Sequence, residues 1–313
     1  MPFIDNILKH RSLSIVGLEK NTGKTECLNY ILRRLPSEYI NVAVTSIGID
    51  GESLDQVTST AKPEIILREG IFFATSEKHY RQRGLLSELL DVSDETTSLG
   101  RIVTAKALTE GKILLSGPSS SASLSRWMKS MERFKIDLTI IDGALSRLSA
   151  ASPAVSECMI LSTGAALSAN IRELVSKTAF IVELIGLPET DAKADEKVSS
   201  FVDFSGDILK GEKVIEVEGA LTDRLLTSAR NELQSGAKEL IVGDFTKIFA
   251  TADQYRAFLR RGGRISVRKK SKLIAVCVNP VSPSGIVLDS DMLCKTLSEA
   301  INLPVYDIKR GNR

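Results

Sequence analysis

The chain has 313 residues, of which 43% are hydrophobic and 26% charged, a composition that supports a packed core and excludes an intrinsically disordered chain. Lysine and arginine total 41 against 39 aspartate and glutamate, so the net charge of +2 creates no overall field that would draw the protein to nucleic acid or an anionic membrane. The length corresponds to one large or two ordinary domains.

Short apolar segments alternate with helical patterns from the beginning of the chain. We expect helices at residues 25–35, 121–133 and 168–178. Strands are expected at residues 13–18, 42–47, 65–73, 102–108, 113–115, 138–141 and 159–162. Short apolar strands separated by helices are typical of a parallel sheet covered on both faces. The sequence therefore predicts an α/β, doubly wound fold.

The alternation weakens after Gly186, and a polar stretch follows at residues 189–196, where we place a domain boundary. Beyond this stretch the pattern resumes, with strands expected at residues 214–217, 239–243 and 273–278 and helices at residues 222–233, 253–259 and 291–300. The predicted organisation is a first domain at residues 1–187 and a smaller α/β domain at residues 188–313.

The histidines and cysteines exclude several classes of site. Two histidines, without an HExxH spacing, do not support hydrolytic zinc chemistry. Four cysteines without CxxC pairing indicate buried thiols in a reducing compartment rather than a disulfide framework.

The first eleven residues lack the apolar core of a signal peptide, and no apolar run is long enough to span a membrane. We therefore expect a cytoplasmic protein that does not enter a membrane.

The most informative segment joins the first predicted strand to the first predicted helix and reads Ser14-Ile15-Val16-Gly17-Leu18-Glu19-Lys20-Asn21-Thr22-Gly23-Lys24-Thr25. A strand followed by Gly-Lys-Thr and a helix directs main-chain amides and the positive end of the helix dipole at one spot, where they bind phosphate oxygens. Lys24 would reach the β- and γ-phosphates, and the Thr25 hydroxyl would bind Mg²⁺. The candidate nucleotide-binding residues are Gly17, Asn21, Thr22, Gly23, Lys24 and Thr25.

The spacing of this motif departs from the common form. Leu18 occupies the position of the first glycine in G-x-x-x-x-G-K-[ST], and Gly17 lies one residue earlier. The alternative interpretation is a Gly-Lys-Thr turn that only begins a helix.

Gly17, five residues and then Gly23-Lys24-Thr25 resemble the loop of dethiobiotin synthetase and its relatives among the P-loop proteins, which include the MinD-like ATPases. Residues 138–144 and 159–170 are similar to later segments of the same superfamily. The resemblance implies ATP and Mg²⁺ as ligands and covers about the first 180 residues. No guanine signature of the form Asn/Thr-Lys-x-Asp is present.

Two carboxylates are candidates for the metal. Asp142 follows a buried parallel strand and would face the crevice where such sheets bind ligands. The resemblance also implies an acidic residue after the second strand, for which Asp50 is the first choice and Glu52 the second. Lys24, Asp142 and Asp50 are thus the candidate catalytic residues, and Thr25, Asp50 and Asp142 the candidate metal ligands. Helix capping at Asp142 and turn formation at Asp50-Gly51 are the alternatives.

Neither activity of the related enzymes transfers directly. Dethiobiotin synthetases carry a substrate lysine on the second strand, where this chain has Val44-Thr45-Ser46. MinD-like ATPases carry a signature lysine at the position of Glu19, and the neighbouring Lys20 is either its substitute or an exposed surface lysine.

Residues 15–25, 45–52, 115–119 and 141–147, together with Ser152-Pro153, resemble the P-loop subunit of the reactivase for lysine 5,6-aminomutase. This resemblance implies ATP-driven remodelling of an adenosylcobalamin enzyme, with an aminomutase and a second ATPase subunit as partners; a homodimer is a further expectation. The alternative is a ligase or kinase of the dethiobiotin synthetase class, with a small-molecule pocket near Thr45, Ser46 and Ser116.

Other polar segments have two interpretations each. Ser119 either contacts a substrate or caps the next helix, and Arg147 either clamps phosphate or forms a surface ion pair. The stretch 77–81, which contains His79, reads as a solvated helix face.

The basic run at residues 256–272 would bind nucleic acid only as a third and less favoured function, since it contains few aromatic residues.

Overall fold

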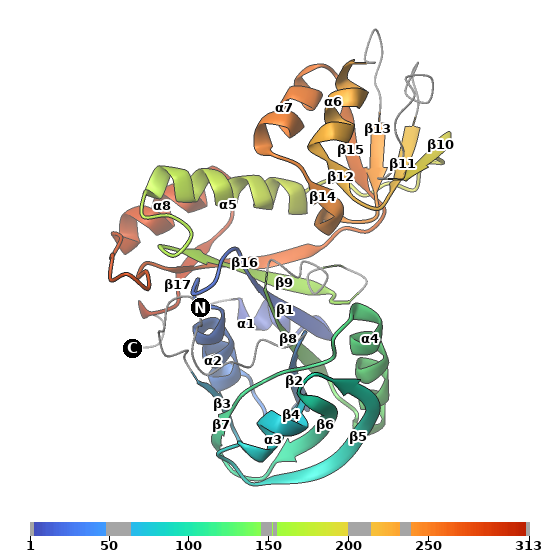
Figure 1. The fold of residues 1–313 in the computed structure, drawn as a ribbon. Helices are drawn as coiled ribbons and strands as arrows, with labels where there is room; N and C mark the ends of the chain where they lie inside the picture. The colour runs from blue at the N-terminus through green and yellow to red at the C-terminus, as the bar shows by residue number, and fades with distance from the viewer. Residues whose placement is uncertain are drawn as a thin grey trace. The chain divides into compact units, whose positions relative to one another are not determined.

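The computed structural model describes residues 3–47, 64–144, 152, 155–199, 214–231 and 239–310. The chain forms two compact units, whose elements are labelled in Figure 1. Unit 1 consists of Met1–Ala151, Val155–Thr178 and Leu273–Arg313, and unit 2 of Ser152–Ala154 and Ala179–Lys272.

Unit 1 is built on one large sheet. Its strands are β1 Ser12–Gly17, β2 Val42–Ser46, β4 Phe72–Ser76, β5 Ser87–Thr97, β6 Gly100–Ala107, β8 Leu138–Ala144, β9 Cys158–Gly164, β16 Lys272–Asn279 and β17 Val305–Asp307. Within the described residues the sheet has nine strands in the order β17-β16-β9-β1-β8-β2-β4-β6-β5. β9, β1, β8, β2 and β4 are parallel to one another, whereas β6 is antiparallel to both β4 and β5. The α/β class with a mostly parallel sheet is confirmed.

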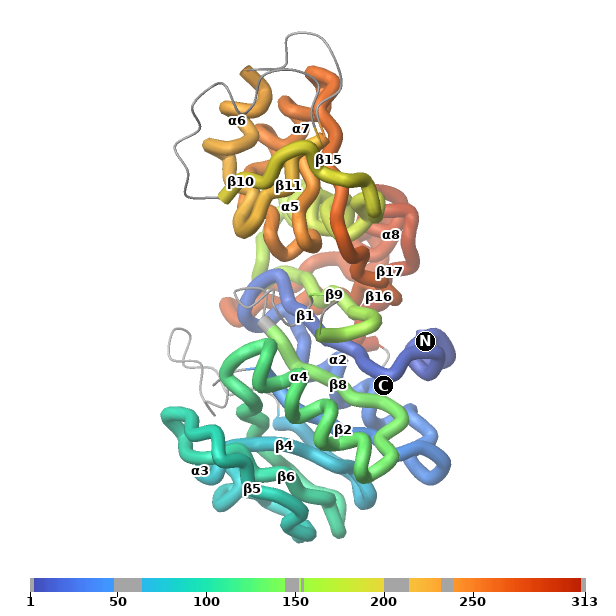
Figure 2. The backbone as a smooth tube through the Cα atoms, turned by 90° about the vertical axis from the view of Figure 1, so that its right-hand side faces the viewer, coloured from blue at the N-terminus to red at the C-terminus, as the bar shows by residue number. Residues whose placement is uncertain are grey.

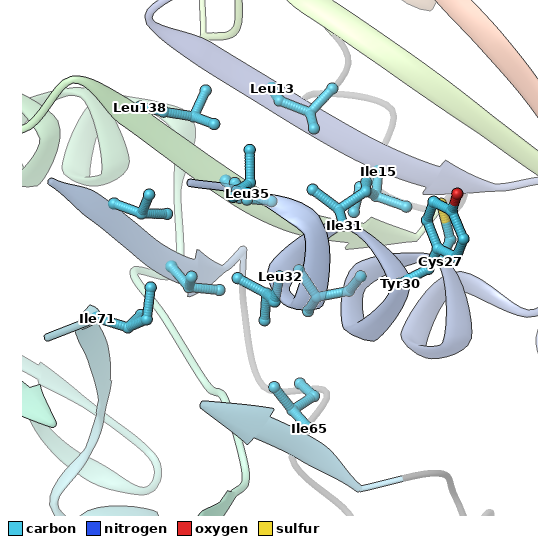
Figure 3. Close-up of a cluster of buried hydrophobic side chains, with 14 of the residues drawn as sticks. Leu13, Ile15, Cys27, Tyr30, Ile31, Leu32, Leu35, Ile65, Ile71 and Leu138 are labelled. Atoms are coloured by element: carbon cyan, nitrogen blue, oxygen red, sulfur yellow. The ribbon is translucent and has the colours of Figure 1, made fainter. Parts of the chain in front are cut away.

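Helices pack on both faces of this sheet because neighbouring strand residues point in opposite directions. Ile140 of β8 packs into a core with Leu28 and Ile31 of α2 (Lys24–Arg34). Figure 3 shows part of this core, with Ile31 of α2 and Leu138 of β8 labelled. The next residue, Ile141, packs into a second core with Leu124 of α4 (Ser121–Ser130). In Figure 2, α4 lies in front of β8 and β2.

The smaller elements of unit 1 differ in part from expectation. The predicted strand at 65–73 is two strands, β3 Ile65–Leu67 and β4, separated by a turn in which Gly70 has a φ of 86°. β3 pairs with β7 Gly111–Ile113 in a separate antiparallel sheet. The helices are α1 Ile4–Ile7, α3 Glu77–Arg81 and α8 Ser290–Ile301, and α5 Ile171–Ile185 begins in unit 1.

Unit 2 contains a second parallel sheet. Its strands are β10 Glu196–Ser199, β11 Val214–Glu218, β13 Glu239–Val242 and β15 Arg264–Val267, hydrogen-bonded in that order. The helices are α6 Asp223–Asn231 and α7 Ala252–Arg260, and the two-residue strands β12 Leu221–Thr222 and β14 Ile248–Phe249 pair beside them. Unit 2 is therefore a smaller α/β unit.

The division of the chain differs from the one expected at residue 187. Residues 273–313 belong to unit 1, because β16 joins the large sheet and its apolar residues Ala275 and Cys277 enter the α2 core. The other boundary lies earlier than predicted, between Thr178 and Ala179, inside α5.

Cys27, Cys158 and Cys277 are buried free thiols and Cys294 is half-buried and free. Within the described residues, no helix is long and apolar enough to cross a membrane.

Candidate functional site

The loop at residues 18–23 joins the end of β1 to the start of α2. The Lys24 side chain passes directly over Gly17: a β-carbon at Gly17 would lie 2.5 Å from Oγ1 of Thr22 and 2.9 Å from Cδ of Lys24. Position 17 therefore requires glycine for steric reasons, because any larger residue would displace Thr22 or Lys24.

Two residues of the 18–23 loop have left-handed backbone conformations. Asn21 has a φ of 60° and Gly23 a φ of 92°. A β-carbon at Gly23 would also lie 2.5 Å from Cδ1 of Ile308 and 3.0 Å from Cβ of Asn279. Alternating left- and right-handed residues curl a chain so that successive amides converge, which is the geometry of main-chain anion sites.

Three carbonyl groups of the loop are engaged by the surrounding protein. Oγ1 of Thr22 donates to the carbonyl of Glu19 (2.9 Å), Nδ2 of Asn279 donates to that of Asn21 (3.3 Å), and Oγ of Ser162 donates to that of Thr22 (2.7 Å). The first amides of any helix lack an acceptor within the helix, and the N-cap residue of α2, Gly23, has no side chain that could supply one. The loop carbonyls are thus bonded to donors of the protein, whereas the start of α2 offers amide donors for a ligand.

Lys24 and Thr25 are half-buried at the first turn of α2. In the part of the chain that the structure describes, neither Nζ of Lys24 nor Oγ1 of Thr25 has a hydrogen-bond or ion-pair partner. The charge of Lys24 is therefore not neutralised by a carboxylate among the described residues. Together with the α2 amides, Lys24 forms a site of positive potential suited to an anion.

Asp142 lies on β8, beside the strand that leads into the loop. Its Cα is paired with that of Ile15 on β1 and that of Ser46 on β2. Because Ile140 faces α2, the alternation along β8 places the half-buried Asp142 on that same face. Adjacent strands are about 4.8 Å apart. The structure therefore brings Asp142 to the side of the sheet that carries the 18–23 loop. The other predicted site residues, Asp50, Glu52 and Arg147, lie outside the described residues.

The hydroxyl residues assigned to a small-molecule pocket are buried and bonded within the protein. Oγ of Ser116 donates to Oγ of Ser76 (2.7 Å), accepts from the Ser76 amide (3.1 Å) and lies 2.8 Å from Nδ1 of His79. Because a hydroxyl has one hydrogen, Nδ1 of His79 is the donor in this last contact. Ser46 accepts from the amide of Gly117 (3.0 Å). This network fixes the loop at residues 114–118 against β2 and β4.

Two expectations about this region are wrong. The stretch 77–81 is not a fully solvated face, since His79 is 4% exposed and burial lowers its pKa below 6.5, with a further contribution from the charge of Lys78. The residue that caps α4 is Ser120, which accepts from the Ser123 amide. Ser119 instead donates to Glu95 (3.2 Å).

The contacts of Asn279, Ser162 and Ile308 with the loop were not predicted. Asn279 ends β16, and its own carbonyl accepts from the amide of Ala165 (2.9 Å), which follows β9. The sequence carried a signal for two of these residues: Ser162 ends the strand expected at 159–162, and Asn279 follows the strand expected at 273–278, at the edge where loops of parallel sheets meet. Ile308 lies beyond the last predicted element and had no such signal.

The basic run at 256–272 is partly neutralised within unit 2. Arg268 lies 2.8 Å from Glu216, which lowers the pKa of that carboxyl group through the hydrogen bond. Arg264 lies 3.9 Å from Glu239, and Arg256 lies 3.5 Å from Glu183. Three of its arginines are thus already paired with carboxylates.

Comparison with known proteins gives no family for the chain: no protein-family model, curated protein or solved structure matches it.

Proposed function

We propose that unit 1 binds the triphosphate of a Mg²⁺–ATP complex at the 18–23 loop and hydrolyses it. The observation that carries the proposal is the half-buried Lys24 at the start of α2: its side-chain stem lies over Gly17, and its ammonium group has no carboxylate partner among the described residues. A polyphosphate supplies the negative charge that this position lacks.

The residues present fit the ligand. The amides at the start of α2 would bind the phosphate oxygens, and Lys24 would neutralise the charge that accumulates on the transferred group. Thr25 and Asp142 would hold the divalent ion, whose contribution is to neutralise phosphate charge. Since phosphoryl transfer depends mainly on positioning and charge stabilisation, these groups suffice for slow hydrolysis, with water as the nucleophile.

The role of ATP hydrolysis follows from the resemblance of the sequence to the P-loop subunit of the lysine 5,6-aminomutase reactivase. We infer that hydrolysis drives a conformational step on a partner enzyme, as in the reactivase of lysine 5,6-aminomutase. Turnover of ATP that rises on addition of the aminomutase would support this role. The ligase alternative receives no support from Ser46 and Ser116, because both are buried and bonded within the protein.

Isothermal titration calorimetry with Mg²⁺–ATP tests the proposal. Charge-assisted hydrogen bonds contribute about 1.5–3 kcal/mol each. Lys24→Ala should therefore weaken ATP binding by about 10- to 150-fold. Arg33→Ala, which removes an exposed cation from the other end of α2, is the control and should bind as the unmodified protein does. Equal affinity of the Lys24 variant and the control would refute the assignment.

A further inference from the structure

Two buried thiols of unit 1 meet in the core between α2 and β16. Sγ of Cys27 lies 3.7 Å from Sγ of Cys277, 250 positions later in the chain, and both side chains are fully buried. Cys27 belongs to α2 and is labelled in Figure 3, and Cys277 belongs to β16. Cys158, on the neighbouring strand β9, instead donates to the carbonyl of Ser12 (3.4 Å). Cys27 and Cys277 are thus a separate pair of free thiols at contact distance.

This pair joins the two segments that shape the 18–23 loop. The amide of Cys27 donates to the carbonyl of the N-cap residue of α2 (2.9 Å), so Cys27 moves with the first turn, which carries Lys24. Cys277 precedes Asn279 by two positions, and the alternation along a strand places both on the same side of β16. Asn279 in turn donates to the loop (3.3 Å). A change in the distance between the two sulfurs therefore shifts the start of α2 against the strand that holds the loop.

A peroxide is the class of oxidant that can join these thiols. One sulfur attacks the peroxide, the O–O bond breaks, and a sulfenic acid and one water form; the second sulfur then displaces the sulfenic hydroxyl as a second water, and the S–S bond forms. The two thiols give up two electrons and two protons, and hydrogen peroxide is reduced to two waters. The contact with Cys27 and burial raise the pKa of the Cys277 thiol. Since a buried, protonated thiol reacts slowly, the pair stays reduced until peroxide accumulates.

The disulfide would change the geometry of the loop. It would shorten the distance between the two sulfurs to about 2 Å and so draw the start of α2 and the end of β16 together. The Lys24 stem lies close over Gly17 and would move with the helix start. Phosphoryl transfer depends on positioning, and a displacement of about 1 Å costs about 100-fold in rate. Oxidation should therefore slow hydrolysis without removing any group that binds the nucleotide.

From these contacts we propose that Cys27 and Cys277 are a site of reversible oxidative modification, at which a peroxide forms a disulfide that displaces Lys24 and slows ATP hydrolysis. The inference rests on the proposed function and adds a means of regulation to it. A thiol reductant reverses the modification, because thiol–disulfide exchange returns both sulfurs to the thiol form.

Two measurements on the full chain test the proposal. Hydrolysis of Mg²⁺–ATP is followed before treatment with hydrogen peroxide, after it, and after addition of dithiothreitol. Mass spectrometry of unreduced proteolytic peptides identifies the disulfide independently of activity. Cys277→Ala removes one partner of the pair, and Cys27→Ala removes the other, so the result does not depend on the folding of one variant. Cys158→Ala, which removes a buried thiol from the adjacent strand, is the matched control.

The expected result is a peptide pair linked through Cys27 and Cys277, with a rate that falls at least about tenfold and recovers with dithiothreitol. Both variants of the pair should keep their rate in peroxide, whereas Cys158→Ala should lose it as the unmodified protein does. Absence of this disulfide, a disulfide without a change in rate, or equal inactivation of the Cys277 variant overturns the inference and leaves the proposed function standing. Absence of hydrolysis by the reduced protein overturns the proposed function, and the peptide map then still decides whether the thiols are the site of modification.

Discussion

The side-chain amide of Asn279 donates to the main-chain carbonyl of Asn21, 258 positions away in the sequence. The same residue accepts from the amide of Val281 through Oδ1 (3.2 Å) and from the amide of Ala165 through its own carbonyl (2.9 Å). Asn21, one of the two left-handed residues of the 18–23 loop, is thus held by strand β16. The contact is possible because β16 belongs to the large sheet of unit 1.

Removal of this contact should weaken nucleotide binding more than it weakens folding. Asn279→Ala deletes the donor to Asn21, and the loop then has to be ordered by the ligand. We expect a loss of affinity of about tenfold, which corresponds to one hydrogen bond. Asn6→Ala, at an exposed position of α1, is the control and should bind normally in the same calorimetric titration.

A β-carbon at position 17 should abolish nucleotide binding. Gly17→Ala places that carbon 2.5 Å from Oγ1 of Thr22 and 2.9 Å from the Lys24 side chain, so the lysine has to leave its position. Gly84→Ala is the matched control, because its nearest neighbour would be 3.6 Å away. Titration of both variants with Mg²⁺–ATP should show binding only for the control. Normal binding by Gly17→Ala would contradict the described path of Lys24.

Asp142→Asn should change how the rate of hydrolysis depends on the Mg²⁺ concentration, rather than the ability of the protein to bind nucleotide. The amide keeps the size of the side chain but removes the negative charge that would hold Mg²⁺. We expect hydrolysis to require at least about tenfold more Mg²⁺ for half-maximal rate. Asp137→Asn neutralises an exposed aspartate just before the same strand and should leave the Mg²⁺ titration unchanged.

The stability of unit 1 should fall in mildly acidic solution because of His79. Burial lowers the pKa of His79 in the folded protein below its ordinary value of 6.5. At a pH between the folded and the unfolded pKa of His79, the unfolded chain binds more protons than the folded protein. The contribution of neutral His79 to the free energy of unfolding is therefore complete above about pH 6.5 and declines as the pH falls through the folded pKa.

The measurement is urea denaturation at about pH 7.5 and about pH 5.5, on either side of the ordinary value. His79→Asn keeps a nitrogen donor for Ser116 but does not titrate, so its denaturation midpoint should fall less between the two conditions. An equal fall in both proteins would show that another group is responsible.

Local patterns predicted the part of the site that is continuous in sequence. The strand, the loop and the helix around Gly17 and Lys24 follow from one apolar run, one Gly-Lys-Thr and one amphipathic period. The position of Asp142 follows from its place near the end of a buried strand. The clamp by Asn279 was not predicted, because it depends on the return of the chain to the first sheet after unit 2. Apolar periodicity identifies a strand at residues 273–278 but does not say which sheet it joins.

A crystal structure of the protein with Mg²⁺ and adenylyl imidodiphosphate tests nucleotide binding most directly. We expect the triphosphate at the 18–23 loop, with Nζ of Lys24 within hydrogen-bond distance of a terminal phosphate oxygen and Oγ1 of Thr25 bound to the metal. A nucleotide bound elsewhere, with the loop free of phosphate and Lys24 turned to solvent, would contradict it.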